Sequence, residues 1–134
     1  IDEVEEDELM DRFNVTPGGI RAKVEHADWL LYACTELCTL KGWDTARSDL
    51  SKLRIRMKHG IREELLPLVR FKGVGRVRAR ALYERDITST EDLRSVGFTK
   101  LKKAVGKRTA EKLKEQVGDD DHFDKENILH YFDD

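Results

Sequence analysis

The chain has 134 residues, of which 39% are hydrophobic and 39% are charged, and its formal net charge is −2. This length fits one domain or two small ones, and the apolar content suffices for compact cores. No apolar run approaches the roughly 20 residues of a membrane span, and the first residues lack the basic and apolar segments of a signal peptide. These features argue against a membrane-spanning or secreted class and predict a soluble protein of the cytoplasm.

The charge is distributed unevenly along the chain. Residues 1–16 and residues 117–134 each contain seven acidic residues and one basic residue, which gives a net charge of −6 at each end. Because the whole chain carries −2, residues 17–116 carry +10. A basic middle is typical of a surface that binds a polyanion, although a solvated charged surface has the same composition.

Apolar residues recur at spacings of three and four along almost the whole chain, whereas the alternation typical of β-strands is absent. We therefore predict an all-α fold, with helices over residues 3–13, 19–41, 45–58, 61–70, 75–84, 89–95, 98–103, 107–116 and 125–132. Gly60 is expected to cap the third of these helices. Pro67 falls inside the fourth and should kink it or mark the start of a second domain, so we place a domain boundary near residue 60.

The second predicted helix has one apolar stripe and a tryptophan outside it. At about 100° per residue, the stripe consists of Ile20, Val24, Ala27, Leu31, Cys34 and Cys38. Both cysteines are expected to be buried thiols rather than metal ligands or disulfide partners. Trp29 lies on the opposite side, so either the helix is buried on two sides or Trp29 is a platform on which unpaired bases stack. In the second case Arg21, about two turns upstream, would contact a phosphate.

The stretch "FKGVGRVRARAL", residues 71–82, places two glycines directly before a predicted helix. Glycine is used where the backbone takes a positive φ or approaches a ligand closely, and a helix N-terminus carries unpaired N–H donors. Arg76 and Arg80 follow one helical turn apart. The pattern favours a nucleic-acid phosphate bound by the backbone from Gly73 to Gly75, although a glycine turn without a ligand would have the same sequence.

An internal repeat predicts a second hairpin. A shift of 31 residues pairs Val74 with Val105, Gly75 with Gly106, Arg76 with Lys107, Ala79 with Ala110, and Leu82 with Leu113. Ala104 replaces the first glycine, so the second copy is degenerate. The pattern resembles the tandem helix-hairpin-helix domain, which generally binds DNA without sequence preference through backbone amides and basic residues. The residues predicted to bind DNA are therefore Arg21, Trp29, Gly73, Val74, Gly75, Arg76, Arg80, Lys103, Gly106, Lys107 and Arg108.

Most of the chain resembles a known family. The stretches "EVEEDELMDRFNVTPGGIRAKVEHADWLLYA" and "LRIRMKHGIREELLPLVRFKGVGRVRARALYERDITSTEDLR" are similar to the C-terminal region of archaeal Hjm-type DNA helicases, superfamily 2 translocases related to the helicase part of polymerase theta. The resemblance implies the end of a helical ratchet domain at 1–60, a tandem helix-hairpin-helix domain at 61–117 and an acidic tail at 118–134. The first residue is not Met, and we expect a fragment of a larger protein.

The resemblance also implies roles for these parts. The long helix would be the ratchet helix that touches the translocating single strand, and Trp29 matches the family's stacking tryptophan. The family usually has a basic residue about two turns before it, where this chain has Ala22 between Arg21 and Lys23. The helix-hairpin-helix domain would bind DNA as it emerges and restrain or couple the motor. The partners implied are single-stranded or forked DNA and the motor domains of the same parent chain.

The sequence contains neither a G-x-x-x-x-G-K-[ST] phosphate loop nor a paired-acid motor motif, so we expect no ATPase activity and no cofactor in this chain. The resemblance implies a parent that uses ATP and magnesium as a nucleoid-associated DNA helicase in replication-fork repair or recombination. One alternative is a protein-interaction module that docks on a helicase core or the sliding clamp without binding DNA. Another is a base-excision glycosylase with Asp86 or Asp92 as catalytic group, but Asp92 fits better as an acid in the first turn of a helix.

The tail "KENILHYFDD" has no partner in the repeat. Ile128, Tyr131 and Phe132 have the spacing of one helical turn, which would place three apolar groups on one side. The segment resembles the sliding-clamp-binding motif, with Lys125 at the position of the motif's glutamine. We expect either insertion into a hydrophobic pocket of the clamp or folding back onto the helix-hairpin-helix core.

Overall fold

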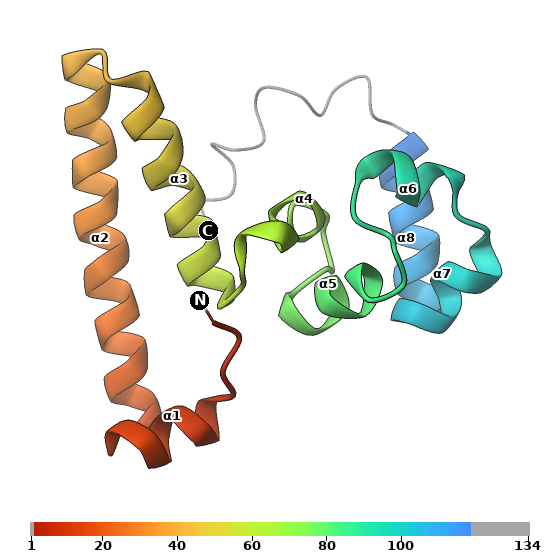
Figure 1. Ribbon diagram of the computed structural model, residues 1–134, viewed down its shortest axis with the longest axis horizontal. Helices are drawn as coiled ribbons and strands as arrows, with labels where there is room; N and C mark the ends of the chain where they lie inside the picture. Colours follow the sequence, from red (N-terminus) through yellow and green to blue (C-terminus); the bar gives the residue numbers. More distant parts are fainter. Residues whose placement is uncertain (1, 119–134) are drawn as a thin grey trace. The chain divides into compact units, whose positions relative to one another are not determined.

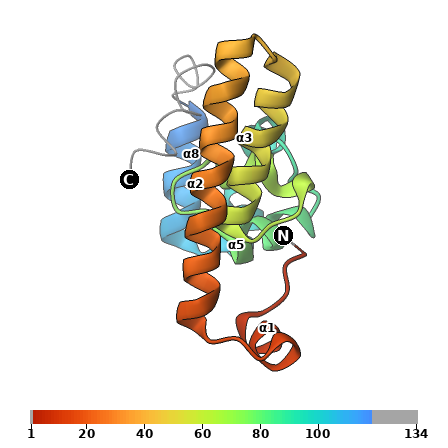
Figure 2. The same cartoon turned by 90° about the vertical axis from the view of Figure 1, so that its left-hand side faces the viewer.

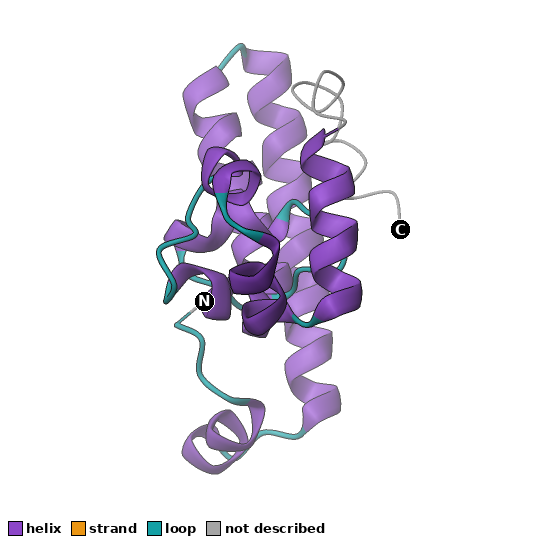
Figure 3. Cartoon of the chain, turned by 90° about the vertical axis from the view of Figure 1, so that its right-hand side faces the viewer, coloured by secondary structure: helices purple, strands orange, loops and turns teal. Residues whose placement is uncertain are grey.

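The computed structural model of the chain describes residues 2–118, which form helices and connecting segments without any strand (Figure 3). The prediction of an all-α fold is confirmed for this part of the chain. The fold divides after Leu66 into two compact units, each of which is described by itself. No helix within residues 2–118 is both long enough and apolar enough to cross a lipid bilayer.

The first unit is built on a helical hairpin. Figure 1 and Figure 2 show its two long helices lying side by side and antiparallel. The helices of the unit are α1 (Glu6–Phe13), α2 (Pro17–Lys41), α3 (Asp44–His59) and the 3₁₀ turn η1 (Glu63–Leu65). The Thr16 hydroxyl accepts a hydrogen bond from the Gly19 N–H at 3.1 Å and caps α2, whose first residue is Pro17. Gly60 caps α3 with a φ of 65°, as predicted.

The apolar stripe of α2 faces α3, but it is covered less completely than the sequence predicts. Cys38 is the one stripe residue that is buried, and Ile20, Val24, Ala27 and Leu31 are half-buried. The prediction of a buried thiol is wrong for Cys34, which is exposed. Cys34 lies about 40° from the stripe's centre, on the edge away from Asp28 and Tyr32, which are the residues that contact Arg54 of α3.

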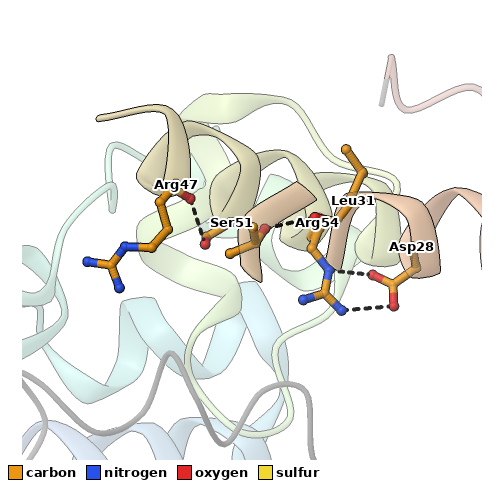
Figure 4. A network of polar contacts seen from close by, with 6 residues as sticks. Asp28, Leu31, Arg47, Ser51 and Arg54 are labelled. Carbon is orange, nitrogen blue, oxygen red and sulfur yellow. Dashed lines mark hydrogen bonds and ion pairs between the residues drawn. The ribbon is translucent and has the colours of Figure 1, made fainter. Parts of the chain in front are cut away.

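A charged pair joins the two long helices (Figure 4). Arg54 of α3 donates from Nε and Nη2 to the two carboxylate oxygens of Asp28 of α2, at 2.9 and 3.0 Å. The Arg54 guanidinium also lies 5.2 Å from the ring centre of Tyr32, one turn further along α2. Only 6% of Arg54 is exposed, whereas 40% of the Asp28 side chain is. The pair therefore fixes the rotation of α2 relative to α3 with a buried cation and a partly hydrated anion.

We expect unequal losses of stability when each member of this pair is removed. Asp28→Ala leaves the buried guanidinium without its carboxylate and should lower the free energy of unfolding by roughly 2–3 kcal/mol. Arg54→Met keeps apolar packing against Tyr32 and leaves a carboxylate that water can reach, so its cost should be smaller. Urea denaturation of both variants measures the difference. Equal losses would show that the pair's energy does not depend on which charge is buried.

The segment predicted as one helix over residues 61–70 is helical over 63–69 but is not a single regular helix. The chain forms η1 and then, without a break, the four-residue helix α4 (Leu66–Val69). Pro67 is the second residue of α4, a position where its missing N–H is tolerated. After Val69 the chain leaves the helix and enters the loop that carries Gly73.

The second unit has a compact apolar core. Its further helices are α5 (Arg76–Tyr83), α6 (Thr90–Ser95), α7 (Phe98–Val105) and α8 (Lys107–Gly118). α7 packs against α5 and α8, and α8 also packs against α6. The buried side chains are Leu68, Val69, Phe71, Val74, Ala79, Leu82, Ile87, Leu93, Leu101, Val105, Ala110, Leu113 and Val117.

α6 and α8 cap each other's carboxyl ends. The Lys114 ammonium of α8 donates to the backbone carbonyls of Leu93 and Arg94 at 2.9 Å, and also to that of Val96. In return, Arg94 of α6 donates from Nε to the carbonyl of Val117 at 3.1 Å. Carbonyls that a helix end leaves without intrahelical donors are thus satisfied by cations of the neighbouring helix.

Asp92 is part of a capping box at the start of α6. Its Oδ2 accepts hydrogen bonds from the N–H groups of Thr88 and Ser89 at 2.9 and 3.0 Å, and the Ser89 hydroxyl accepts from the Asp92 N–H at 3.1 Å. The interpretation of Asp92 as an acid of the first helical turn is confirmed. Because its carboxylate is hydrogen-bonded in the cap, Asp92 does not fit the role of catalytic group in a glycosylase.

The cap predicts a pH dependence. Hydrogen bonds from the Thr88 backbone, and then from Ser89 and the Thr88 side chain, lower the pKa of Asp92 below its ordinary value. A carboxyl whose pKa is lower in the folded state stabilises the fold above its unfolded pKa of about 3.9. That contribution is lost as the pH falls through the lower folded pKa. NMR titration of the Asp92 carboxyl should show the depressed midpoint, and the stability advantage over Asp92→Asn should shrink over the same pH range.

Candidate nucleic-acid interface

The first hairpin is a loop from Arg70 to Gly75 between α4 and α5. Gly73 has a φ of 86°, a conformation that side chains other than glycine's rarely adopt. Gly75 is the N-cap residue of α5, and it supplies no side-chain hydrogen bond to the first turn. The side chains of Phe71 and Val74 are 1% and 3% exposed, which anchors the loop in the core. The side chain of Val74 is therefore not available to a ligand, and its N–H donates to the Phe71 carbonyl at 3.1 Å.

Two polar side chains hold the same loop. The side-chain amide of Gln116 bonds the backbone of Lys72, and the Arg78 guanidinium donates to the carbonyl of Gly73 at 2.8 Å. The sequence analysis did not select either residue. It also did not select Lys72, whose exposed side chain lies directly before Gly73. Its position directly before the glycine turn could have identified Lys72 from the sequence.

In the second hairpin a single residue, Gly106, connects α7 to α8. α7 ends at Val105, Gly106 has a φ of 85°, and α8 begins at Lys107. Ala104 lies within α7, so the helix continues where the first copy has a loop. This geometry explains why the second copy does without the first glycine.

The repeat predicts the correct register for both copies. α5 begins one residue after Gly75 and α8 begins one residue after Gly106. The Ala79 N–H bonds the Gly75 carbonyl at 2.9 Å, and the Ala110 N–H bonds the Gly106 carbonyl at 3.0 Å. The matched residues Val74 and Val105, Ala79 and Ala110, and Leu82 and Leu113 are all buried.

The predicted basic residues of the hairpins lie on three helices of the second unit. Arg76 and Arg80 are half-buried on α5, and the Arg80 guanidinium lies 5.3 Å from the ring centre of Tyr83. Lys103 is exposed in the last turn of α7. Lys107 and Arg108 are exposed in the first turn of α8, where Lys107 is 4.0 Å from Glu111. The two glycine turns thus each have cations at the adjoining helix ends.

Trp29 is 67% exposed in the middle of α2, which agrees with its predicted position outside the core stripe. Leu40, which is 82% exposed, lies about 20° around the helix from Trp29, and Leu37, which is 58% exposed, lies about 80° from it. Arg21 is exposed nearer the start of the helix. Trp43, which the sequence analysis passed over, is 60% exposed directly after α2. In the described part of the chain, the exposed side of α2 that bears Trp29 is thus mixed, since the exposed Glu25 and Glu36 lie within about 40° of Trp29 around the helix.

Two family models match the chain, one for each unit. Residues 1–60 match the archaeal helicase domain 4, and residues 65–119 match the SAM-like helix-hairpin-helix tandem. The two matches meet between residues 60 and 65, close to the division between the two compact units after Leu66.

Curated relatives agree with these matches. The ATP-dependent DNA helicase Hel308 of Pyrococcus horikoshii is 40% identical over 122 residues, which are 88% of this chain and 17% of that protein. The Hel308 proteins of Methanocaldococcus jannaschii and Pyrococcus abyssi are 39% and 43% identical, over 88% and 79% of this chain and 10% and 15% of their own lengths. The chain thus spans less than a fifth of these relatives. The resemblance to archaeal DNA helicases is confirmed.

The predicted clamp-binding residues Ile128, Tyr131 and Phe132, and the helix predicted over 125–132, lie outside the described residues. Within residues 2–118 no group of three or more histidine, cysteine, aspartate or glutamate side chains is placed to hold a metal ion.

Proposed function

We propose that the chain binds single-stranded or forked DNA without sequence preference, as the accessory part of an ATP-dependent DNA helicase that acts in replication-fork repair or recombination. The observation that carries the proposal is the first hairpin, where a glycine loop leads into α5 without a side-chain cap. Arg76 and Arg80 follow on the same helix. The names of the relatives and the helix-hairpin-helix match support the same conclusion.

The chemistry of this hairpin suits a phosphate. The first turn of α5 presents N–H donors that have no intrahelical partner, and the helix dipole adds a partial positive charge. Contacts of this kind fix the position of a nucleic acid but read no bases, so the affinity should not depend on sequence. Trp29 would add stacking on unpaired bases, which every base permits. ATP and magnesium would be bound by the parent's motor domains, because this chain has no phosphate-loop motif.

A salt titration tests the proposal. We expect fluorescently labelled single strands and forks of unrelated sequence to bind the chain with similar affinity, measured by anisotropy. The logarithm of the binding constant should fall linearly with the logarithm of the salt concentration, with a slope of about −0.7 per phosphate on a single strand. Absence of binding to any DNA at low salt would exclude the proposal.

The second candidate is a protein-docking module. The exposed Trp29, Leu37 and Leu40 of α2 favour it, because large apolar side chains that gather on a surface are often covered by a partner. Docking on helicase motor domains would bury these side chains with little dependence on salt. Binding of the tail to the sliding clamp remains a prediction from the sequence.

A further inference from the structure

The side-chain amide of Gln116 holds the first hairpin from a helix 44 residues further along the chain. Its Oε1 accepts a hydrogen bond from the backbone N–H of Lys72 at 2.8 Å, and its Nε2 donates to the backbone carbonyl of Lys72 at 3.2 Å. The same Nε2 donates to the carbonyl of Lys112, one turn earlier in α8, at 3.2 Å. The amide is thereby fixed to its own helix and to both polar groups of one loop residue.

The contact lies at the residue before the left-handed Gly73. On the other side of Gly73 the chain is held by the buried Val74, and the carbonyl of Gly73 itself accepts from Arg78. The Val74 N–H also donates to the Phe71 carbonyl at 3.1 Å, which closes a turn around Lys72 and Gly73. The Gln116 amide adds a hold on the N–H and carbonyl of Lys72 themselves. A segment that contains two glycines loses more backbone entropy when it becomes ordered than one without glycine.

We propose that Gln116 is a positioning residue for DNA binding, because it holds the Lys72 backbone and so preorganises the turn from Gly73 to Gly75 for a phosphate. This inference rests on the proposed DNA-binding function. A preorganised loop binds more tightly because no binding free energy is spent on ordering it. The amide itself touches no DNA and carries no charge, so its effect is separable from that of the arginines.

Gln116→Met is the direct test, because methionine has nearly the same length and forms no such hydrogen bonds. The Lys72 amide hydrogen should exchange at least about tenfold faster in this variant. The dissociation constant for a labelled single strand should rise about 2- to 10-fold at every salt concentration. The slope of the salt titration should stay unchanged, because no cation has been removed.

Ser89→Ala is the matched control. It removes one bond of the capping box at α6 and lowers stability within the same unit, but it does not touch the hairpin loop. Its DNA affinity should equal that of the parent chain. If Ser89→Ala weakens binding as much as Gln116→Met does, the loss reflects general stability and the positioning role is wrong.

The outcomes separate this inference from the proposed function. A parent chain that binds no DNA removes the proposed function whatever Gln116 does. A parent that binds DNA, together with a Gln116→Met variant of equal affinity, removes the positioning role alone, as does an unchanged exchange rate at Lys72. If the variant fails to fold, amide hydrogen exchange in the parent chain decides. Protection of the Lys72 amide supports the positioning role of Gln116, and exchange at the rate of a free peptide contradicts it.

Discussion

Replacing Arg76 and Arg80 together by alanine weakens binding to every DNA sequence by about the same factor, which we expect to be roughly tenfold or more. Arg76 directly follows the glycine turn and Arg80 lies one turn further along α5, and both would neutralise phosphates rather than read bases. Each phosphate contact that is lost also reduces counterion release. The slope of the salt titration should therefore become shallower by up to about 2.

The control for this variant removes two other exposed cations. Lys52→Ala combined with Lys100→Ala changes the net charge equally, but Lys52 lies on α3 and Lys100 lies six residues before Gly106. Anisotropy should give a larger loss and a shallower slope for the arginine pair than for the lysine pair. Equal losses would mean that net charge, not the hairpin, attracts the DNA. Circular dichroism must show that both variants keep their helical content.

Trp29→Ala should reduce affinity for single-stranded DNA by an amount that corresponds to about 1–3 kcal/mol, the usual value of one stacked base. Binding to a blunt duplex should change far less, because its bases are already stacked on one another. Since 67% of Trp29 is exposed, the variant should lose little stability. Paired measurements of affinity and of urea denaturation separate the two effects.

Trp43→Ala is the comparison for this experiment. Trp43 is nearly as exposed, at 60%, and belongs to the same unit, but it lies after the end of α2. A specific platform at Trp29 predicts a smaller loss of single-strand affinity for Trp43→Ala. If Trp29→Ala keeps its affinity and instead loses several kcal/mol of stability, Trp29 is a packing residue.

Periodic burial made much of the second unit predictable. The pairs Ala79 with Ala110 and Leu82 with Leu113 recur because each hairpin must bury the same two positions, and the structure buries all four. The helix starts after Gly75 and Gly106 followed from the same repeat. Local pattern and core packing agree here, so the register could be read from one sequence.

Other features depend on contacts that leave no local pattern. The contact between Gln116 and Lys72 joins residues far apart in sequence, and a single glutamine has no periodicity to reveal it. The exposure of Cys34 depends on how far one neighbouring helix reaches around α2, which the spacing of apolar residues does not tell. The apolar spacing predicted one helix over 61–70 with a kink or a domain start at Pro67, and the structure has a 3₁₀ turn that changes to α-helix at Leu66, directly before the proline.

The reciprocal capping of α6 and α8 bears on how the second unit opens. Lys114 and Arg94 each belong to one helix and satisfy carbonyls of the other, so neither helix can fray at its carboxyl end without releasing its neighbour's cation. Fraying normally makes helix ends the first parts of a protein to exchange their amide hydrogens. Here the two ends form one cooperative element. The six-residue helix α6 is therefore more stable than an isolated helix of that length would be.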